Sequence, residues 1–158
     1  MAKSEKQKLK LLYIIQCLME KTDEEHAVTT QEIIDYLALQ GITAERKSIY
    51  TDIDLLIDFG MDIIKKPGRS GGYTLASRQF ELAELKLLVD AVQSSKFITT
   101  KKSRELIGKL ETLCSKYEAT QLHRQVVVTN RNKAINENIY YNVDIIYNAI
   151  AENVKIQF

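Results

Sequence analysis

The sequence has few of the residues that form metal centres and disulfide scaffolds. Its 158 residues include two cysteines and two histidines, and no Cys-x-x-Cys or His-x-x-x-His spacing brings them together. We therefore expect no metal site and no cofactor. Cys17 and Cys114 each lie in the apolar stripe of a predicted helix. They are expected to be reduced cysteines of a protein core.

Long hydrophobic runs and catalytic motifs are also missing. No apolar run approaches the roughly 20 residues of a membrane-spanning helix, and residues 1–6 lack the apolar core of a signal peptide. The sequence contains no Gly-x-x-x-x-Gly-Lys-Ser/Thr phosphate loop, and His26 and His123 stand apart from other catalytic side chains. We therefore expect a cytoplasmic protein with no membrane partner and no enzymatic activity.

Neither sign of charge is in excess. The formal net charge is +1. Residues 1–72 carry ten Lys/Arg and twelve Asp/Glu and so sum to −2, whereas residues 73–158 carry twelve and nine and sum to +3. Bulk charge therefore favours no particular partner. A prediction of nucleic-acid binding must rest on where the charges lie.

The first predicted helix spans residues 5–21. Its apolar residues recur at helical spacing; they include Leu11, Ile15 and Leu18. Lys6, Lys8 and Lys10 lie at its start. These lysines either contact a phosphate backbone or form a solvated helix face.

A second and a third helix follow, joined by a short turn. Thr29 and Glu32 fit a capping box at the start of the second helix. Gly41 ends this helix, where a left-handed residue is needed, and Thr43 is predicted to cap the next. Two short helices joined by a turn of about four residues that contains glycine are typical of a helix-turn-helix.

The third helix, residues 43–58, orders its side chains by face. Apolar residues lie on one side, whereas Lys47, Tyr50 and Thr51 point outward in its first half. Asp54 and Asp58 continue the outward face toward its end. A recognition helix inserts its N-terminal part into the major groove. This order of charges therefore predicts a DNA-reading helix.

A β-hairpin with a basic tip follows the third helix. Residues 65–72 lie between two short segments of alternating polarity, and they contain Lys65, Lys66 and Arg69. The glycines of this tip are expected to supply the positive φ that a hairpin needs. Alone, such a tip is more often a solvated loop. Directly after a helix-turn-helix it indicates a wing that meets the DNA backbone or minor groove.

These segments resemble the winged helix-turn-helix of bacterial WYL-domain transcriptional regulators. The most specific parts are residues 48–53 and the Gly-Gly-Tyr-x-Leu sequence of residues 71–75, and the similarity continues into residues 133–142 and 149–150. In that family a β-rich WYL domain, thought to sense a ligand, follows. No WYL motif is present here. The resemblance therefore implies that a ligand acts only through a missing C-terminal domain.

The second half is predicted to be mainly helical. Helices are expected over residues 81–93, 101–116 and 142–153, with a less regular stretch between residues 121 and 142. Residues 126–128 have the composition of a short strand, and residues 154–158 alternate like a first strand. The first two helices either form a dimer interface with a second chain or pack only within their own chain. The residues expected in the dimer interface are Leu82, Leu85, Val89, Val92, Leu106, Leu110 and Leu113.

Together the patterns predict a mainly α fold: a winged helix-turn-helix of three helices plus a hairpin wing, followed by a helical linker and dimerisation region. The expected domains are residues 1–77, 78–153 and 154–158, the last being the start of a truncated β-rich sensor domain. We expect a nucleoid-associated homodimer that binds double-stranded DNA and regulates transcription. The alternative is a winged-helix module for protein–protein interaction. The predicted DNA-binding residues are Thr43, Arg46, Lys47, Ser48, Tyr50, Thr51, Lys65, Lys66 and Arg69.

Overall fold

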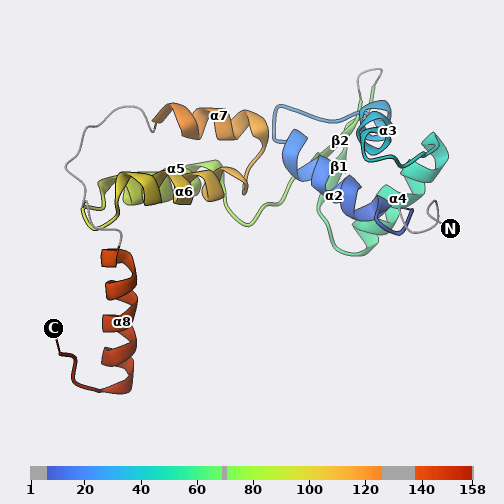
Figure 1. Ribbon diagram of the computed structural model, residues 1–158. Helices are drawn as coiled ribbons and strands as arrows, with labels where there is room; N and C mark the ends of the chain where they lie inside the picture. The colour runs from blue at the N-terminus through green and yellow to red at the C-terminus, as the bar shows by residue number, and fades with distance from the viewer. Residues whose placement is uncertain (1–6, 69–70, 126–137, 158) are drawn as a thin grey trace.

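A computed structural model describes residues 7–68, 71–125 and 138–157 (Figure 1). The fold is mainly helical with one two-stranded antiparallel sheet, and it confirms the predicted fold class. In chain order the elements are α2 (Lys10–Lys21), α3 (Thr30–Leu39), α4 (Arg46–Asp58), β1 (Ile63–Lys65), β2 (Tyr73–Leu75), α5 (Leu82–Ser94), α6 (Thr100–Glu111), α7 (Lys116–Gln125) and α8 (Asn138–Glu152).

Helices α2, α3 and α4 and the β1–β2 hairpin form the winged-helix body. Its core consists of apolar side chains from all five elements, and residues such as Ile14, Leu37 and Ile53 have none of their surface exposed. Ile63 pairs with Leu75 across the hairpin, and both side chains point into this core. The body therefore buries one face of each helix and of the wing, as a winged helix-turn-helix requires.

Local capping explains where α3 begins and ends. The Thr29 side chain accepts a hydrogen bond from the Glu32 amide, and the Glu32 side chain accepts one from the Thr29 amide, so the predicted capping box is confirmed. Gly41 has a φ of 74°, which confirms the left-handed residue expected after this helix.

Helix α4 begins later than predicted. Residues 43–45 are not helical, and Glu45 rather than Thr43 is the N-cap residue, with an extended backbone at φ −103° and ψ 154°. The Thr43 carbonyl instead accepts a hydrogen bond from Gln7 Nε2 at 3.0 Å. The turn between α3 and α4 is therefore longer than predicted.

The glycines at the wing tip were all predicted to supply positive φ, but they have two different roles. Gly68 has the positive φ, 114°, whereas Gly71 and Gly72 are needed for close backbone approach. A Cβ atom on Gly72 would meet the Val28 carbonyl oxygen, to which the Tyr73 amide donates a hydrogen bond at 2.8 Å. Gly72 thus lets the wing dock against the segment between α2 and α3.

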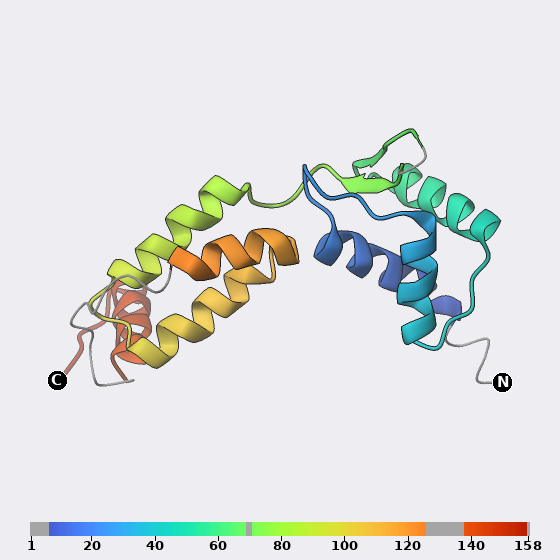
Figure 2. The same cartoon turned by 90° about the horizontal axis from the view of Figure 1, so that it is seen from above.

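Helices α5, α6 and α7 form a second body around a smaller core. The fully or nearly buried residues of this core are Leu85, Val89, Ile107, Cys114 and Leu122. Figure 2 shows this body beside the winged-helix body, joined to it by the extended segment of residues 76–81.

Helix α7 was not predicted, and the predicted helix over residues 101–116 was too long. The chain turns after Glu111, and Ser115 starts a new helix through a reciprocal cap with Glu118. Ser115 Oγ accepts from the Glu118 amide at 3.1 Å, and Glu118 Oε2 accepts from the Ser115 amide at 3.0 Å. The apolar stripe continues across this turn, so periodicity alone concealed the break.

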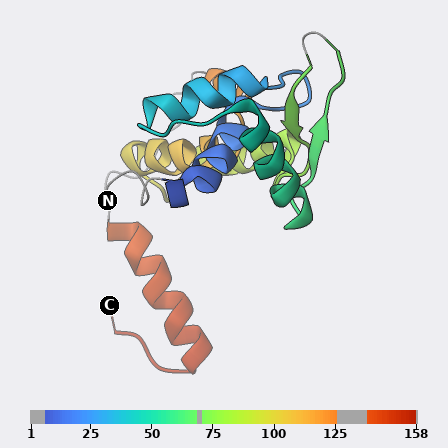
Figure 3. The same cartoon turned by 90° about the vertical axis from the view of Figure 1, so that its right-hand side faces the viewer.

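Helix α8 confirms the predicted last helix but begins at Asn138 instead of residue 142. It extends away from the other helices (Figures 1 and 3), and apolar side chains such as Tyr147 and Ile150 are exposed. Residues 154–157 form no strand, and the predicted strand over 126–128 lies outside the described residues. Among the residues that the structure describes, no helix is long and apolar enough to cross a membrane.

Candidate nucleic-acid interface

The outward face of α4 carries three exposed polar side chains. Lys47, Tyr50 and Thr51 all lie on the surface, and 45% of Tyr50 is exposed. Thr51 Oγ1 donates to the Lys47 carbonyl at 3.2 Å, so its oxygen can still accept a hydrogen bond. An ammonium, a phenol and a hydroxyl on one turn and a half of helix supply the donors and acceptors that base edges in a major groove recognise.

The N-terminal end of α4 has backbone amides that no side chain of the described residues caps. Its first turn contains no acidic residue, and the N-cap residue Glu45 makes no side-chain capping hydrogen bond in the described part of the chain. The first backbone amides of the helix therefore lack intrahelical partners, and the helix dipole adds positive potential. Arg46 lies beside this end, with one long hydrogen bond of 3.4 Å to Gln31 Oε1. Such an end suits a phosphate group.

A buried ion pair fixes α4 against α2. Lys10 Nζ lies 2.6 Å from Asp52 Oδ2, with side chains that are 14% and 10% exposed, and it also donates to Ser48 Oγ at 2.5 Å. Lys10 therefore points at α4. The sequence had allowed a contact between Lys10 and a phosphate backbone, but its ammonium group is bound within the protein. Ser48 is half-buried, and its oxygen accepts from Lys10, which leaves its proton for one further acceptor.

A distant partner for Asp52 could have been expected from the sequence. Asp52 lies three residues after the buried Ile49, so a helical projection places it toward the core. An acidic residue on a buried face requires a partner, and this signal could have pointed to a lysine elsewhere in the chain.

The wing is tied to the end of α4 by a surface ion pair. Lys65 Nζ lies 2.5 Å from Asp54 Oδ1, with side chains that are 54% and 59% exposed. The hydrogen bond that Lys65 donates to the Asp54 carboxylate raises the pKa of Lys65, so Lys65 remains protonated. An exposed pair of this kind contributes little stability and is easily exchanged for another anion.

Lys66 points toward the segment after α2 and not toward the hairpin tip. Its Nζ donates to the Glu24 carbonyl at 3.0 Å, and the side chain is half-buried. The third predicted wing cation, Arg69, lies outside the described residues. Both described wing cations therefore have a partner within the protein.

Exposed apolar side chains border this interface. Leu55 and Phe59 are one turn apart at the end of α4 and are 51% and 82% exposed. We call Leu55 and Phe59 the apolar border. Such side chains are more typical of a protein-binding surface than of a DNA-binding one.

The predicted dimerisation residues lie largely inside the helical body. Leu85 and Val89 have none of their surface exposed, so in this conformation they are not available to a second chain. Four others are partly buried against the same core: Leu82, Val92, Leu110 and Leu113. Leu106 is half-buried. The dimer remains a prediction, and packing within the chain accounts for the burial of these residues.

The two cysteines are buried and free, as expected of core residues. Burial raises the pKa of both Cys17 and Cys114 to about 11, so both remain protonated thiols at neutral pH. Within residues 7–68, 71–125 and 138–157, no group of three or more His, Cys, Asp or Glu side chains could hold a metal ion.

Comparison with known families gives one match. Residues 12–68 match the family model described as FokI, D3 domain, a DNA-binding winged-helix-like domain. The match covers nearly all of α2, and α3, α4, β1 and the start of the wing tip. No curated protein and no solved structure matches the chain. The winged-helix body is thus similar to a DNA-binding domain over the elements that carry Lys47, Tyr50 and Thr51.

Proposed function

We propose that the chain is a sequence-specific DNA-binding regulator of transcription. The observation that carries this proposal is the exposed face of α4. Lys47, Tyr50 and Thr51 follow a helix start whose backbone amides no described side chain caps, within the segment that is similar to a DNA-binding domain. The chain acts by binding and not by catalysis.

In this proposal the α4 side chains recognise the DNA sequence, and neighbouring groups bind the DNA backbone. Lys47, Tyr50 and Thr51 contact base edges in the major groove, and Arg46 with the α4 amides holds a phosphate. Lys65 exchanges its exposed partner Asp54 for a phosphate when DNA binds. Thr43, Ser48, Lys66 and Arg69 complete the predicted backbone contacts.

The resemblance to WYL-domain regulators suggests how such a regulator is assembled and where it binds. It favours a homodimer at two half-sites, bound to the nucleoid. The most specific residues of this resemblance, 48–53 and 71–75, belong to α4 and the wing. Exposed apolar side chains on α5 and α8, such as Leu87 and Ile145, are available to a second chain.

A second candidate function is a winged-helix module that binds a protein. The apolar border of Leu55 and Phe59 favours this alternative because it exposes large hydrophobic side chains beside the predicted DNA-binding face. The ion pair of Lys65 with Asp54 also reduces the free positive charge of the wing.

Salt-dependent selection of genomic DNA fragments distinguishes the two candidates. A groove-reading protein retains a subset of fragments, and its affinity falls steeply as salt increases, because each phosphate contact releases counterions. Retention of no fragment at low salt would contradict the regulator and favour the protein-binding module. Sedimentation at tens of micromolar tests the dimer separately, and a monomer at that concentration would contradict it.

A further inference from the structure

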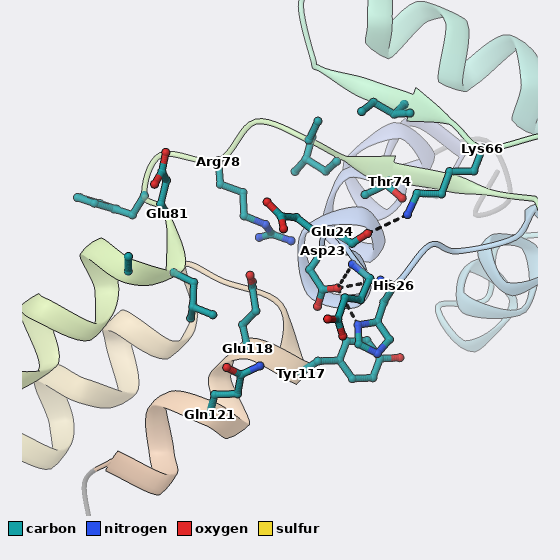
Figure 4. Close-up of a pocket in the computed structure, with 17 residues that line it drawn as sticks. Asp23, Glu24, His26, Lys66, Thr74, Arg78, Glu81, Tyr117, Glu118 and Gln121 are labelled. Carbon is teal, nitrogen blue, oxygen red and sulfur yellow. Dashed lines mark hydrogen bonds and ion pairs between the residues drawn. The ribbon is translucent and has the colours of Figure 1, made fainter.

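A cavity lies between the winged-helix body and the helical body. Its volume is about 730 Å³, within the range typical of small-molecule sites. Its walls come from the segment after α2, the two wing strands, the connecting segment 76–81, the start of α5, and α7 (Figure 4). Neither body alone encloses it.

Carboxylates outnumber cations on the cavity wall. Five acidic side chains line it: Asp23, Glu24, Glu25, Glu81 and Glu118. The basic side chains there are Lys66 and Arg78, with His26 in addition. The wall is therefore negative overall when His26 is neutral.

The two permanent cations are already held by backbone carbonyls. Lys66 donates to the Glu24 carbonyl, and the Arg78 guanidinium donates to the carbonyls of Met19 and Thr22. The Glu24 and Glu25 carboxylates, in contrast, are exposed and make no ion pair within the described ranges. Charge available to a ligand on this wall is thus negative.

Thr74 gives an independent sign that the cavity is a site. Its side chain lines the cavity and is 4% exposed, and its hydroxyl has no hydrogen-bond partner among the described residues. Figure 4 shows Thr74 on the cavity wall next to Lys66. Buried hydroxyls nearly always have a partner, so this one has hydrogen-bonding capacity left for a ligand.

Another part of the wall is apolar. The wing contributes Ile64 and Leu75, and the connecting segment and the start of α5 contribute Ala76, Phe80, Leu82 and Ala83. An aliphatic chain fits such a wall, and a positive group at its end fits the carboxylates of Glu24 and Glu25. DNA does not fit, because its phosphates would meet these carboxylates.

We propose that this cavity binds a small organic cation, an aliphatic amine, between the two bodies of the chain. The ammonium group would lie between the carboxylates of Glu24 and Glu25, and no proton is transferred on binding. The Thr74 hydroxyl would accept a hydrogen bond from a nitrogen of the same ligand. Binding in this place is independent of DNA.

Isothermal titration calorimetry of the full chain with cadaverine, an aliphatic diamine, tests the proposal. Glutarate, the dicarboxylate of the same chain length, is the matched ligand control. We expect saturable one-to-one binding of cadaverine and none of glutarate. Absence of saturable cadaverine binding, or equal binding of glutarate, would overturn the proposal.

Three variants locate the site. Glu24→Gln combined with Glu25→Gln removes exposed charges without structural partners, and it should weaken cadaverine about tenfold. Glu152→Gln on the distant α8 is the matched control and should leave binding unchanged. Thr74→Val changes no charge, so weaker binding in this variant places the ligand inside the cavity. If the glutamate variant binds cadaverine more weakly but Thr74→Val binds it as the wild type does, the ligand is held only by surface charge, and the proposed site is wrong.

Discussion

The winged-helix body and the helical body differ in how they are held together. The winged-helix core contains fourteen buried residues, twelve from its five elements and two from connecting segments, whereas the helical core contains five, from α5, α6, α7 and the turn before α7. The winged-helix body also has internal polar ties, since Lys10 pairs with Asp52, and Thr22 Oγ1 accepts from the Leu75 amide at 3.0 Å. The winged-helix body thus combines a larger core with internal polar contacts, and the helical body has the smaller core.

The main contact between the bodies is centred on Asp23. This buried carboxylate accepts from Ser115 Oγ at 2.6 Å, from the His26 amide at 2.8 Å, and lies 2.7 Å from His26 Nδ1. The His26 ring in turn stacks on Tyr117, with ring centroids 3.7 Å apart. One loop of the winged-helix body thus holds the turn between α6 and α7.

The largest expected effect is the loss of a core side chain from the winged-helix body. Ile53→Ala should lower the free energy of unfolding by about 4 kcal/mol, because Ile53 is fully buried where α4 meets the rest of this body. Leu85→Ala in the helical body should cost about 2 kcal/mol, since a smaller core collapses more readily around a cavity. Denaturant unfolding measures both. Leu39→Ala, at an 81% exposed position, is the control, and equal losses in both bodies would contradict the comparison.

Removing the cation that holds α4 should have the next largest effect. Lys10→Met leaves the Asp52 carboxylate buried without its partner, and we expect a loss of about 3 kcal/mol in unfolding free energy. Lys8→Met, at an exposed position on the same segment, should have little effect. If both variants unfold at the same denaturant concentration, the Lys10 pair does not stabilise the recognition helix.

Breaking the contact between the bodies should cost less. Asp23→Ala removes the acceptor of Ser115 and His26, and we expect a loss of about 2 kcal/mol at neutral pH. Burial alone would raise the Asp23 pKa, but hydrogen bonds from Ser115 and His26 outweigh this and hold the pKa below its ordinary value. The stabilisation is therefore present above the unfolded pKa of about 3.9 and is lost as pH falls through the lower folded pKa.

Unfolding curves of the wild type and of Asp23→Ala, measured from neutral to acid pH, test whether the stabilisation by Asp23 is lost at low pH. The two proteins should converge in stability as Asp23 becomes protonated. Ser115→Ala removes both the hydrogen bond to Asp23 and the cap that Ser115 Oγ forms on the Glu118 amide, so it should lower stability and expose α7 amides to hydrogen exchange. A difference that grows on acidification would contradict this role of Asp23.

The smallest expected effect is an increase in stability. Thr74→Val replaces a buried hydroxyl that has no partner with a methyl group, and we expect about 1 kcal/mol of added stability. Thermal unfolding without ligand measures it. Thr51→Val on the exposed face of α4 is the matched control, because its hydroxyl already donates to the Lys47 carbonyl. A destabilised Thr74→Val protein would mean that the hydroxyl has a partner in solution.

Much of the winged-helix body could be predicted because its signals are local. The capping box of Thr29 and Glu32, the left-handed Gly41 and the apolar stripes each lie within a few residues, and the helix-turn-helix and wing follow from them. Helix α7 was missed although Ser115 and Glu118 form the same kind of cap, because the apolar stripe of α6 continues across the turn.

The partners of the charged residues could not be predicted in the same way. Lys10 meets Asp52, and Asp23 meets Ser115, across 42 and 92 residues of sequence. Such pairs depend on how whole elements pack, and periodicity does not encode that. Lys66 was therefore assigned to the wing tip, whereas its ammonium lies against the Glu24 carbonyl.

The most direct test of the central claim, that α4 reads a DNA groove, is the affinity of Lys47→Ala for selected and unselected DNA. Fluorescence anisotropy is measured at several salt concentrations, with Lys96→Ala in the helical body as the matched charge control. We predict that Lys47→Ala reduces the preference for the selected fragment about tenfold or more, while Lys96→Ala leaves that preference unchanged. An equal, small loss of affinity for all sequences in both variants would contradict the claim.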